Sequence, residues 1–433
     1  MSANRPVPNL LALVALVVCA GCRTAHGAVN AGGEGRCRLR EVERRVLIAN
    51  DGRALYVEPQ TFTSNGREAL LAGAPSLVWR PDPDSGWVME KSNSVFGVIV
   101  APGKPARIVP RPAGSSDAID GVQGVANRDG SWTVIWLEVD SASREETFPR
   151  VLRLRAARLL GDGRWAGPPE ELPVPEDVER LNYRTASVPF AVGDSVLWGL
   201  SASIRERPQR GLLYVRHAGQ WRVDRLPGPH VLYVAPAWSA RSGLVAAVIR
   251  PDTTLLDDGN SLFLYGHRNG WRVLQRIVLG KEAPAYTPQW AVTSHGLALG
   301  WKQYTGGILG HPAISAALLG DSVSATRPSI SQVYLVPTFK SGPLGAPIWL
   351  TQDVRDSGMV ARVTMVRDGH VDTLGTVRSR SARFTFTRFA AFHDAADRNL
   401  ILTGPEASPS GDSLPPFFSR LVEARIECPG ATH

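Results

Sequence analysis

The sequence has little of what marks helices. No long stretch of its 433 residues places apolar residues at i, i+3, i+4 and i+7, the spacing of an amphipathic helix. Short strand-like runs fill the chain instead, separated by Gly, Pro, Asp and Asn. The sequence therefore predicts an all-β protein. Its length would suggest two average domains, but all-β repeat folds often exceed that size as one unit.

Common enzyme and metal-site motifs are missing as well. The sequence contains no HExxH, GxSxG, phosphate-binding loop or CxxC pair. Asp252, Asp257 and Asp258 come nearest to an acidic calcium loop, and we expect them to be solvated. The histidines are dispersed without metal-ligand spacing. We therefore predict no cofactor and assign no metal-ligating residue.

Clusters of one charge are absent too. Lys and Arg number 48 against 40 Asp and Glu, which gives a net charge of +8. The excess is scattered and forms no basic array interleaved with aromatic residues, so nucleic-acid binding is not expected. Solvated charges along strand edges account for the balance, and attraction to anionic surface polymers is the alternative.

The N-terminal apolar run, Leu10–Val18, is too short to span a bilayer. It follows Arg5 and precedes Ala20-Gly21-Cys22, which resembles the end of a bacterial lipobox, although Cys19 stands where that motif usually has Leu. We expect a lipoprotein-type signal peptide over 1–21, a lipid on Cys22 and a flexible Gly/Ala-rich tether over 22–36. The protein would then be exported and anchored at the cell envelope, periplasmic or on the surface. The alternative is an ordinary signal peptide with Cys22 as a spare thiol.

One glycine-containing turn returns through the remaining region. It joins two short β-rich runs as GDGRW at 161–165, AGQW at 218–221 and RNGW at 268–271, and weaker forms follow. The apolar residues that close these turns are Trp165, Trp221, Trp271, Val323 and Val371. They lie roughly 50 residues apart, which is the period of a β-propeller blade rather than of a helical repeat.

A second series of strands alternates with these turns. The strands are apolar on both faces, as expected where sheets stack face to face around an axis. Their central residues, again about 50 residues apart, are Trp87, Trp136, Trp198, Val248, Trp301, Trp349 and Leu402. We interpret these tryptophans as packing between blades rather than as a ligand platform. Seven marks predict a seven-bladed β-propeller of four-stranded antiparallel blades, in a single domain over 37–430.

The seventh blade lacks one strand, because its inner hairpin near 388–404 is followed only by the strand 417–428. An unpaired edge invites aggregation, so we expect the N-terminal strand between Arg38 and Ile48 to complete this blade and close the ring.

Two cysteines flank the strands that would close the ring. Cys37 starts the N-terminal strand, Cys428 ends the C-terminal one, and no other cysteine lies outside the signal region. An exported chain can keep a disulfide here, and the loop-entropy model credits it with roughly 4–5 kcal/mol. The alternative is two buried free thiols.

The recurring turn resembles the Asp-box of sialidase-like propellers, Ser/Thr-x-Asp-x-Gly-x-x-Trp between outer strands. Asp162-Gly163-Arg164-Trp165 and Asp129-Gly130-Ser131-Trp132 keep its Asp, Gly and Trp but lose the spacers. As architecture the resemblance extends over 40–430, and the Asp-box itself is structural. Sialidases also require an arginine triad, a Tyr/Glu pair and an acidic acid/base, which this sequence does not place residue by residue.

Propellers bind ligands at one end of the axis, with loops that leave the inner strands. The candidate ligand-binding residues in these loops are Glu138, Arg205, Arg250, Asp252, Lys302, Tyr304 and Asp353. This mixture favours a binding or scaffold module for a glycan or protein partner. The alternative is a sialidase-like or other propeller glycoside hydrolase, which needs paired carboxylates roughly 5–10 Å apart. We assign no catalytic residue.

Overall fold

The structure is a computed structural model of the chain. It describes residues 37–428 except for gaps at 58–59, 74–75, 91–94, 117, 141, 143–150, 183–184, 206, 253–258, 281–287, 294–295, 306–310, 320–337, 342–344, 356–357, 368–369, 379–387, 393–398 and 408–413. Residues Cys37–Glu427 form one compact unit. The expected signal peptide, tether and Cys22 lie outside the described residues. In the described part, the long elements are all β-strands, and no helix is long and apolar enough to cross a membrane.

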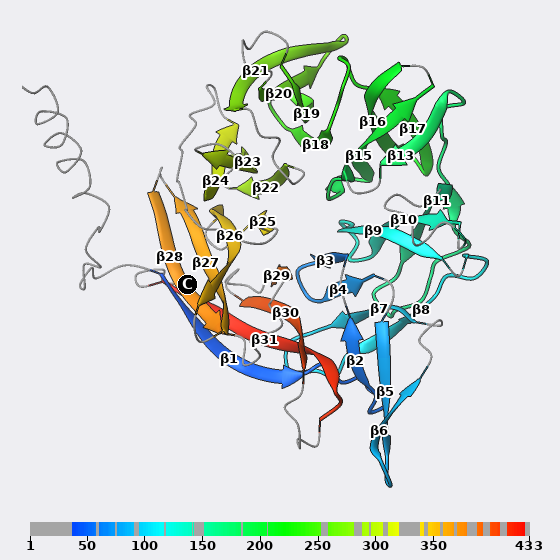
Figure 1. Ribbon diagram of the computed structural model, residues 1–433, viewed down its shortest axis with the longest axis vertical. Coiled ribbons are helices and arrows are strands. Elements are labelled where there is room, and N and C mark those ends of the chain that lie inside the picture. Colours follow the sequence, from blue (N-terminus) through cyan, green and yellow to red (C-terminus); the bar gives the residue numbers. More distant parts are fainter. Residues whose placement is uncertain are drawn as a thin grey trace, which may run out of the picture. The chain divides into compact units, whose positions relative to one another are not determined.

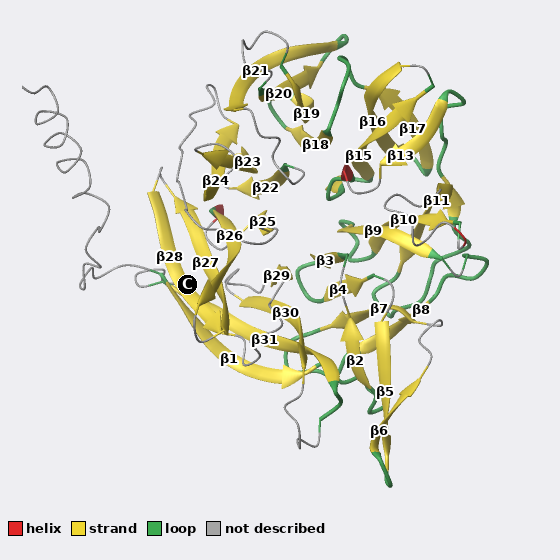
Figure 2. Cartoon of the chain, in the orientation of Figure 1, coloured by secondary structure: helices red, strands yellow, loops and turns green. Residues whose placement is uncertain are grey.

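Most strands assemble into antiparallel sheets of four that follow the chain order (Figures 1 and 2). One such sheet contains β9 (Ile119–Ala126), β10 (Trp132–Val139), β11 (Val151–Leu159) and β12 (Glu170–Glu171). The next contains β13 (Val178–Asn182) and β14 (Phe190–Val192), which both pair with β15 (Ser195–Ile204), and then β16 (Arg207–His217) and β17 (Gln220–Arg225).

The same order repeats in three further sheets. The first of them contains β18 (Tyr233–Ser239), β19 (Gly243–Pro251), β20 (Asn260–His267) and β21 (Trp271–Gly280). The second has three described strands, β22 (Gln289–Thr293), β23 (Gly296–Thr305) and β24 (His311–Leu319). The third contains β25 (Thr338–Ser341), β26 (Pro347–Arg355), β27 (Gly358–Arg367) and β28 (His370–Arg378).

The N-terminal region departs from the predicted pattern by one inserted hairpin. Its four-stranded sheet consists of β3 (Thr61–Ser64), β4 (Ala69–Ala72), β7 (Val95–Val100) and β8 (Arg107–Pro110). Between β4 and β7 the chain forms β5 (Ser76–Asp82) and β6 (Gly86–Glu90), which join β2 (Ala54–Val57) in a separate three-stranded sheet. The prediction that Trp87 marks an inner strand is therefore wrong, since Trp87 lies on β6 and the buried second strand of this sheet is β4.

The two ends of the unit meet in one sheet, as the sequence predicts. Its order is β1 (Arg38–Val46), β31 (Phe417–Glu427), β30 (Asn399–Ala407) and β29 (Arg388–Phe392). Strand β1 pairs antiparallel with β31 from Arg38 opposite Glu427 to Val46 opposite Arg420. Cys37 and Cys428 are joined by a disulfide, which confirms the predicted bridge.

The core consists of side chains held between the faces of neighbouring sheets. Trp136, Trp198 and Trp349 are at most 1% exposed, so their assignment to packing is confirmed. One cluster joins Leu137 of β10 to Trp198 of β15. Burying a large apolar side chain contributes about 1.5–3 kcal/mol, so these contacts stabilise each pair of neighbouring sheets.

Candidate functional site

The predicted ligand-binding residues occupy equivalent places in their sheets. We call these places the strand-end rim, meaning the residues at or just after the C-terminal ends of β10, β15, β19, β23, β26 and β30. The predicted residues on it are Glu138, Arg205, Arg250, Asp252, Lys302, Tyr304 and Asp353. The last strand of this set, β30, adds Glu406, which the sequence analysis missed.

The three carboxylates of the rim with described side chains are buried and engaged by arginines. Glu138 is 3% exposed, accepts a hydrogen bond from the Ser116 N–H at 3.1 Å, and lies 3.7 Å from the Arg155 guanidinium. Asp252 and Glu406, each also 3% exposed, form ion pairs with Arg276 and Arg420.

These pairs follow one pattern. Each acid stands at the end of a second strand, and each arginine comes from a later strand of the same sheet, β11, β21 or β31. An isolated charge would be costly in such a place, because a buried ion needs a partner of opposite sign. A lone acid ending an apolar strand, as in WTVIWLEV, is the sequence signal that could have indicated a buried pair.

Arg250 is different, because its guanidinium has no acidic partner among the described residues. The group lies over the Phe263 ring, with Cζ 4.2 Å from the ring centroid. Gly228, at φ +92°, also lies close to the guanidinium, since a Cβ atom on this glycine would be 3.0 Å from Cζ. Nε is buried and makes no hydrogen bond among the described residues. The guanidinium therefore packs against both the Phe263 ring and Gly228.

Arg205 follows β15 and is the most exposed of the predicted residues with described side chains. Its side chain is 73% exposed, and its Nε lies 3.5 Å from Glu179. Neither Arg205 nor Glu138 forms a described hydrogen bond or ion pair with Arg250 or Asp252, so no described contact yet joins these positions into one site.

The side chains of Lys302, Tyr304 and Asp353 lie outside the described residues, although their backbones belong to β23 and β26. Their predicted role stays a prediction.

The first strands of five sheets line a cavity of about 300 Å³. Its walls come from β3, β9, β14, β22 and β25 and the residues next to them. Polar lining residues include Gln60, Gln123, Gln289, Lys340 and Ser341. Lys340 donates a hydrogen bond to the Phe62 carbonyl, so its ammonium reaches from β25 to β3. Sequence periodicity did not indicate this cavity, because its lining residues lie far apart in the chain.

Much of this cavity's polar lining serves the fold. The Gln60 side chain accepts the Val122 N–H at 2.6 Å and donates to Asp120 at 2.9 Å, which links β3 to β9. Gln289 accepts the Phe339 N–H at 2.8 Å, and Ser341 accepts the Val292 N–H at 3.0 Å. An unpaired buried backbone N–H is costly, so these side chains satisfy the inner edges of neighbouring first strands.

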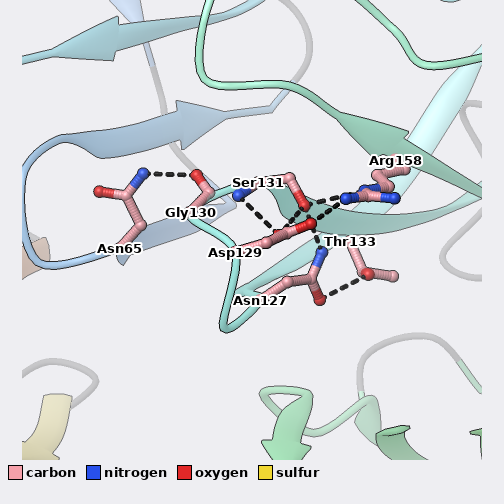
Figure 3. Close-up of polar contacts among 7 residues, drawn as sticks. All are labelled: Asn65, Asn127, Asp129, Gly130, Ser131, Thr133 and Arg158. Atoms are coloured by element: carbon pink, nitrogen blue, oxygen red, sulfur yellow. Dashed lines mark hydrogen bonds and ion pairs between the residues drawn. The ribbon is translucent and has the colours of Figure 1, made fainter. Parts of the chain in front are cut away.

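The aspartate turn Asp129–Trp132 joins β9 to β10, the first and second strands of its sheet, rather than two outer strands (Figure 3). Asp129 accepts hydrogen bonds from the backbone N–H and hydroxyl of Ser131 at 3.1 and 2.6 Å, and it pairs with Arg158 of β11. Asn65, from the turn before β4, donates to the Gly130 carbonyl at 2.6 Å. The turn therefore ties two neighbouring sheets together.

The second aspartate turn, Asp162–Trp165, joins the outer strands β11 and β12, as the Asp-box resemblance implies. The Arg164 side chain, followed by the Arg164 backbone N–H, holds the pKa of Asp162 below its usual value. Trp165 donates to the Pro110 carbonyl at 2.8 Å and contacts Phe96 of the preceding sheet at a centroid distance of 5.3 Å. This turn also contributes to packing between neighbouring sheets.

No group of three or more His, Cys, Asp or Glu residues that could hold a metal ion is found in the part of the chain that the structure describes.

Comparison with known proteins finds similarity to solved structures. No protein-family model matches the chain, and no curated protein matches it. It is similar to the Hadza microbial sialidase Hz136, with 12% identity, a TM-score of 0.43, and coverage of 84% of this chain and 75% of that one. It is similar to the NanB sialidase from Streptococcus pneumoniae, with 9% identity, a TM-score of 0.45, and coverage of 91% and 95%. It is similar to a mutant of the Aleuria aurantia lectin in complex with α-methyl-L-fucoside, with 11% identity, a TM-score of 0.40, and coverage of 75% and 95%. The resemblance to sialidase-like structures is thus present and weak.

Proposed function

We propose that this chain is a binding module: a seven-bladed β-propeller that recognises a glycan or protein partner at its strand-end rim. The chain would be exported and held at the envelope membrane by a lipid on Cys22, with 22–36 as a tether and 37–430 as the propeller. A nucleic acid is not among the proposed partners.

The strand order supports the seven-bladed architecture. Seven sheets repeat one antiparallel order in the described residues, and the β2–β5–β6 sheet stands apart from that repeat. Their first strands contact one another in sequence, and β29 of the last sheet contacts both β25 and β3. Strand β1 pairs with β31, and in this architecture it would be the strand that completes the seventh blade.

The observation that carries the binding proposal is the state of Arg250. Its guanidinium is stacked on Phe263, its Nε is buried, and no carboxylate of the described residues pairs with it. A ring and a guanidinium attract each other, and this contact fixes the side chain before any ligand arrives. An anionic group of a ligand would accept hydrogen bonds from the two terminal nitrogens of Arg250, Nη1 and Nη2.

The rim gives less support to a hydrolase. A glycosidase needs one carboxyl group that can protonate the leaving oxygen and a second that is free to act as base or nucleophile. Glu138, Asp252 and Glu406 are instead each bound to an arginine within their own sheets. Removing one member of such a pair would leave the other charge buried without a partner, which is costly.

A screen of the purified protein on neutral and anionic glycan arrays, beside chromogenic glycosides, tests the proposal. We expect binding to a subset of glycans with anionic groups and no release of chromophore. Hydrolysis of a glycoside that disappears in Glu138→Gln would favour the hydrolase. Absence of binding to any glycan on the arrays would reject glycan recognition by this module.

A further inference from the structure

Arg250 lies on the face of its sheet that packs against the preceding sheet. Ala246 and Val248 of β19 belong to one buried cluster with Leu213 of β16, and β19 pairs with β18 and β20 without a bulge. Side chains two residues apart on a strand share a face, so Arg250 points to the same side as Val248. Its stacking partner Phe263 belongs to the same cluster. The guanidinium therefore stands at the rim end of the boundary between the β13–β17 and β18–β21 sheets, which we call the seam.

The segment that links these two sheets is tied to both of them. The Val231 N–H donates to the Gln209 carbonyl of β16 at 3.2 Å. The Leu232 N–H donates to the Ile249 carbonyl of β19 at 2.8 Å. Val231 is fully buried, which holds the segment down between the sheets. Residues 227–232, which we call the linker, therefore run along the rim end of the seam.

One residue of the linker, His230, has a backbone conformation that favours glycine. Its φ is +56°, and Ala218 is the only other non-glycine residue with a positive φ in the part of the chain that the structure describes. This conformation is costly for a residue with a Cβ atom, whereas glycine adopts it without a steric penalty. The His230 side chain is exposed and makes no hydrogen bond or ion pair with the described residues. A strained position without a packing role is a candidate for a functional one.

His230 is close to the Arg250 guanidinium because Gly228 lies between them in the chain. Gly228 lies against the guanidinium, since a Cβ atom on this glycine would be 3.0 Å from Cζ. Two residues span at most about 7 Å, so the His230 backbone stays near this contact. The imidazole offers a donor and an acceptor, whereas the guanidinium offers only donors. Together they complement a sugar ring that carries an anionic group beside a hydroxyl.

We propose that His230 is a second ligand-contacting residue beside Arg250, and that the ligand lies across the seam rather than on the propeller axis. The ligand is an acidic sugar. Its carboxylate or sulfate accepts hydrogen bonds from the Arg250 guanidinium, and a neighbouring hydroxyl forms a hydrogen bond with the imidazole. The inference rests on the proposed function, because it takes Arg250 as the anion-binding residue.

An NMR titration of the intact protein, labelled with ¹³C at histidine Cε1, tests this contact. The probes are glucuronate and glucose 6-sulfate, with glucose as the uncharged control. The His230 signal, identified by its absence from His230→Gly, should shift with at least one acidic sugar and not with glucose. His230→Gly should raise the dissociation constant about two- to tenfold, the effect of one hydrogen bond. Its urea midpoint should not fall, because glycine adopts a positive φ without a steric penalty.

Two further variants make the result specific. Ala218→Gly makes the same kind of backbone change in the turn between β16 and β17, and it should leave the dissociation constant unchanged. Arg250→Met should weaken binding of the acidic sugar. If it does so while the His230 signal stays unmoved, or while His230→Gly binds like the wild type, the role of His230 is overturned and the Arg250 site remains. Failure of both acidic sugars to bind, equal binding of glucose, or wild-type affinity of Arg250→Met would contradict the Arg250 site and this inference with it.

Discussion

Replacing Gly300 with alanine should destabilise the protein, because this glycine lies where two sheets touch. A Cβ atom on Gly300 of β23 would lie 2.5 Å from Trp349 Cζ2 and 2.7 Å from Phe339 Cγ. Carbon atoms in good contact are about 3.5–4.0 Å apart, so the rings would have to move by about 1 Å. Trp349 and Phe339 are 1% and 2% exposed, so they have little space for such a shift.

The expected cost follows from two opposing effects. Overpacking of a filled core destabilises by about 1–3 kcal/mol. Alanine has less conformational entropy than glycine in the unfolded chain, and this difference offsets about 0.4–1 kcal/mol of the destabilisation. We therefore expect Gly300→Ala to lower the free energy of unfolding by about 1–2 kcal/mol, measured from the urea midpoint at an unchanged slope.

A matched glycine and a second-site change make the test specific. Gly161→Ala adds the same methyl group where no atom lies within 4 Å, and we expect it to leave stability almost unchanged. Adding Trp349→Phe to Gly300→Ala should recover part of the loss, because a smaller ring leaves room for the new methyl group. Wild-type stability of Gly300→Ala, or equal losses at both glycines, would refute this contact between the two sheets.

The remaining predictions concern the termini and the rim. Cys37→Ser should lower the free energy of unfolding by about 2–5 kcal/mol, and non-reducing peptide mapping of the wild type should recover a Cys37–Cys428 cross-link; two alkylatable thiols would exclude it. A fatty-acid probe should label the wild type but not Cys22→Ser, and equal labelling would reject the anchor. Glu406→Gln should destabilise by about 3–5 kcal/mol in thermal and urea unfolding, because it leaves Arg420 buried without its partner. Glu427→Gln, which breaks an exposed pair with Arg40, should change stability by less than about 0.5 kcal/mol; equal effects would show that burial is not the cause.

The repeat could be read from the sequence because each sheet uses the same chemistry. Trp136, Trp198, Trp301 and Trp349 fall on buried second strands, since each fills the space between two sheet faces. The prediction was wrong at Trp87. The β5–β6 hairpin places a tryptophan shortly after a turn, which is the pattern that marks the second strands of the other sheets. The true second strand, β4, has only the sequence ALLA and carries no residue large enough to mark it.

From the sequence, the candidate site could be located only to the strand ends that make up the rim. Strand ends recur with the repeat, so the positions of Glu138, Arg250 and Asp252 followed from the spacing. The burial of Glu138 and Asp252 could not be predicted from the spacing, because the arginines that pair with them come from other strands of the same sheets. The contact between Arg250 and Gly228, which lies before β18, likewise forms only in the folded chain.

The dissociation constant of the tightest anionic glycan from the array, measured for two arginine variants, tests the binding proposal most directly. Arg250→Met and Arg272→Met remove the same charge from the same sheet, the first at the strand-end rim and the second on outer strand β21. Charge-assisted hydrogen bonds contribute about 1.5–3 kcal/mol, so Arg250→Met should weaken binding about ten- to a hundredfold while Arg272→Met leaves it near the wild-type value. Unchanged binding by Arg250→Met, or an equal loss in both variants, would contradict recognition at this rim.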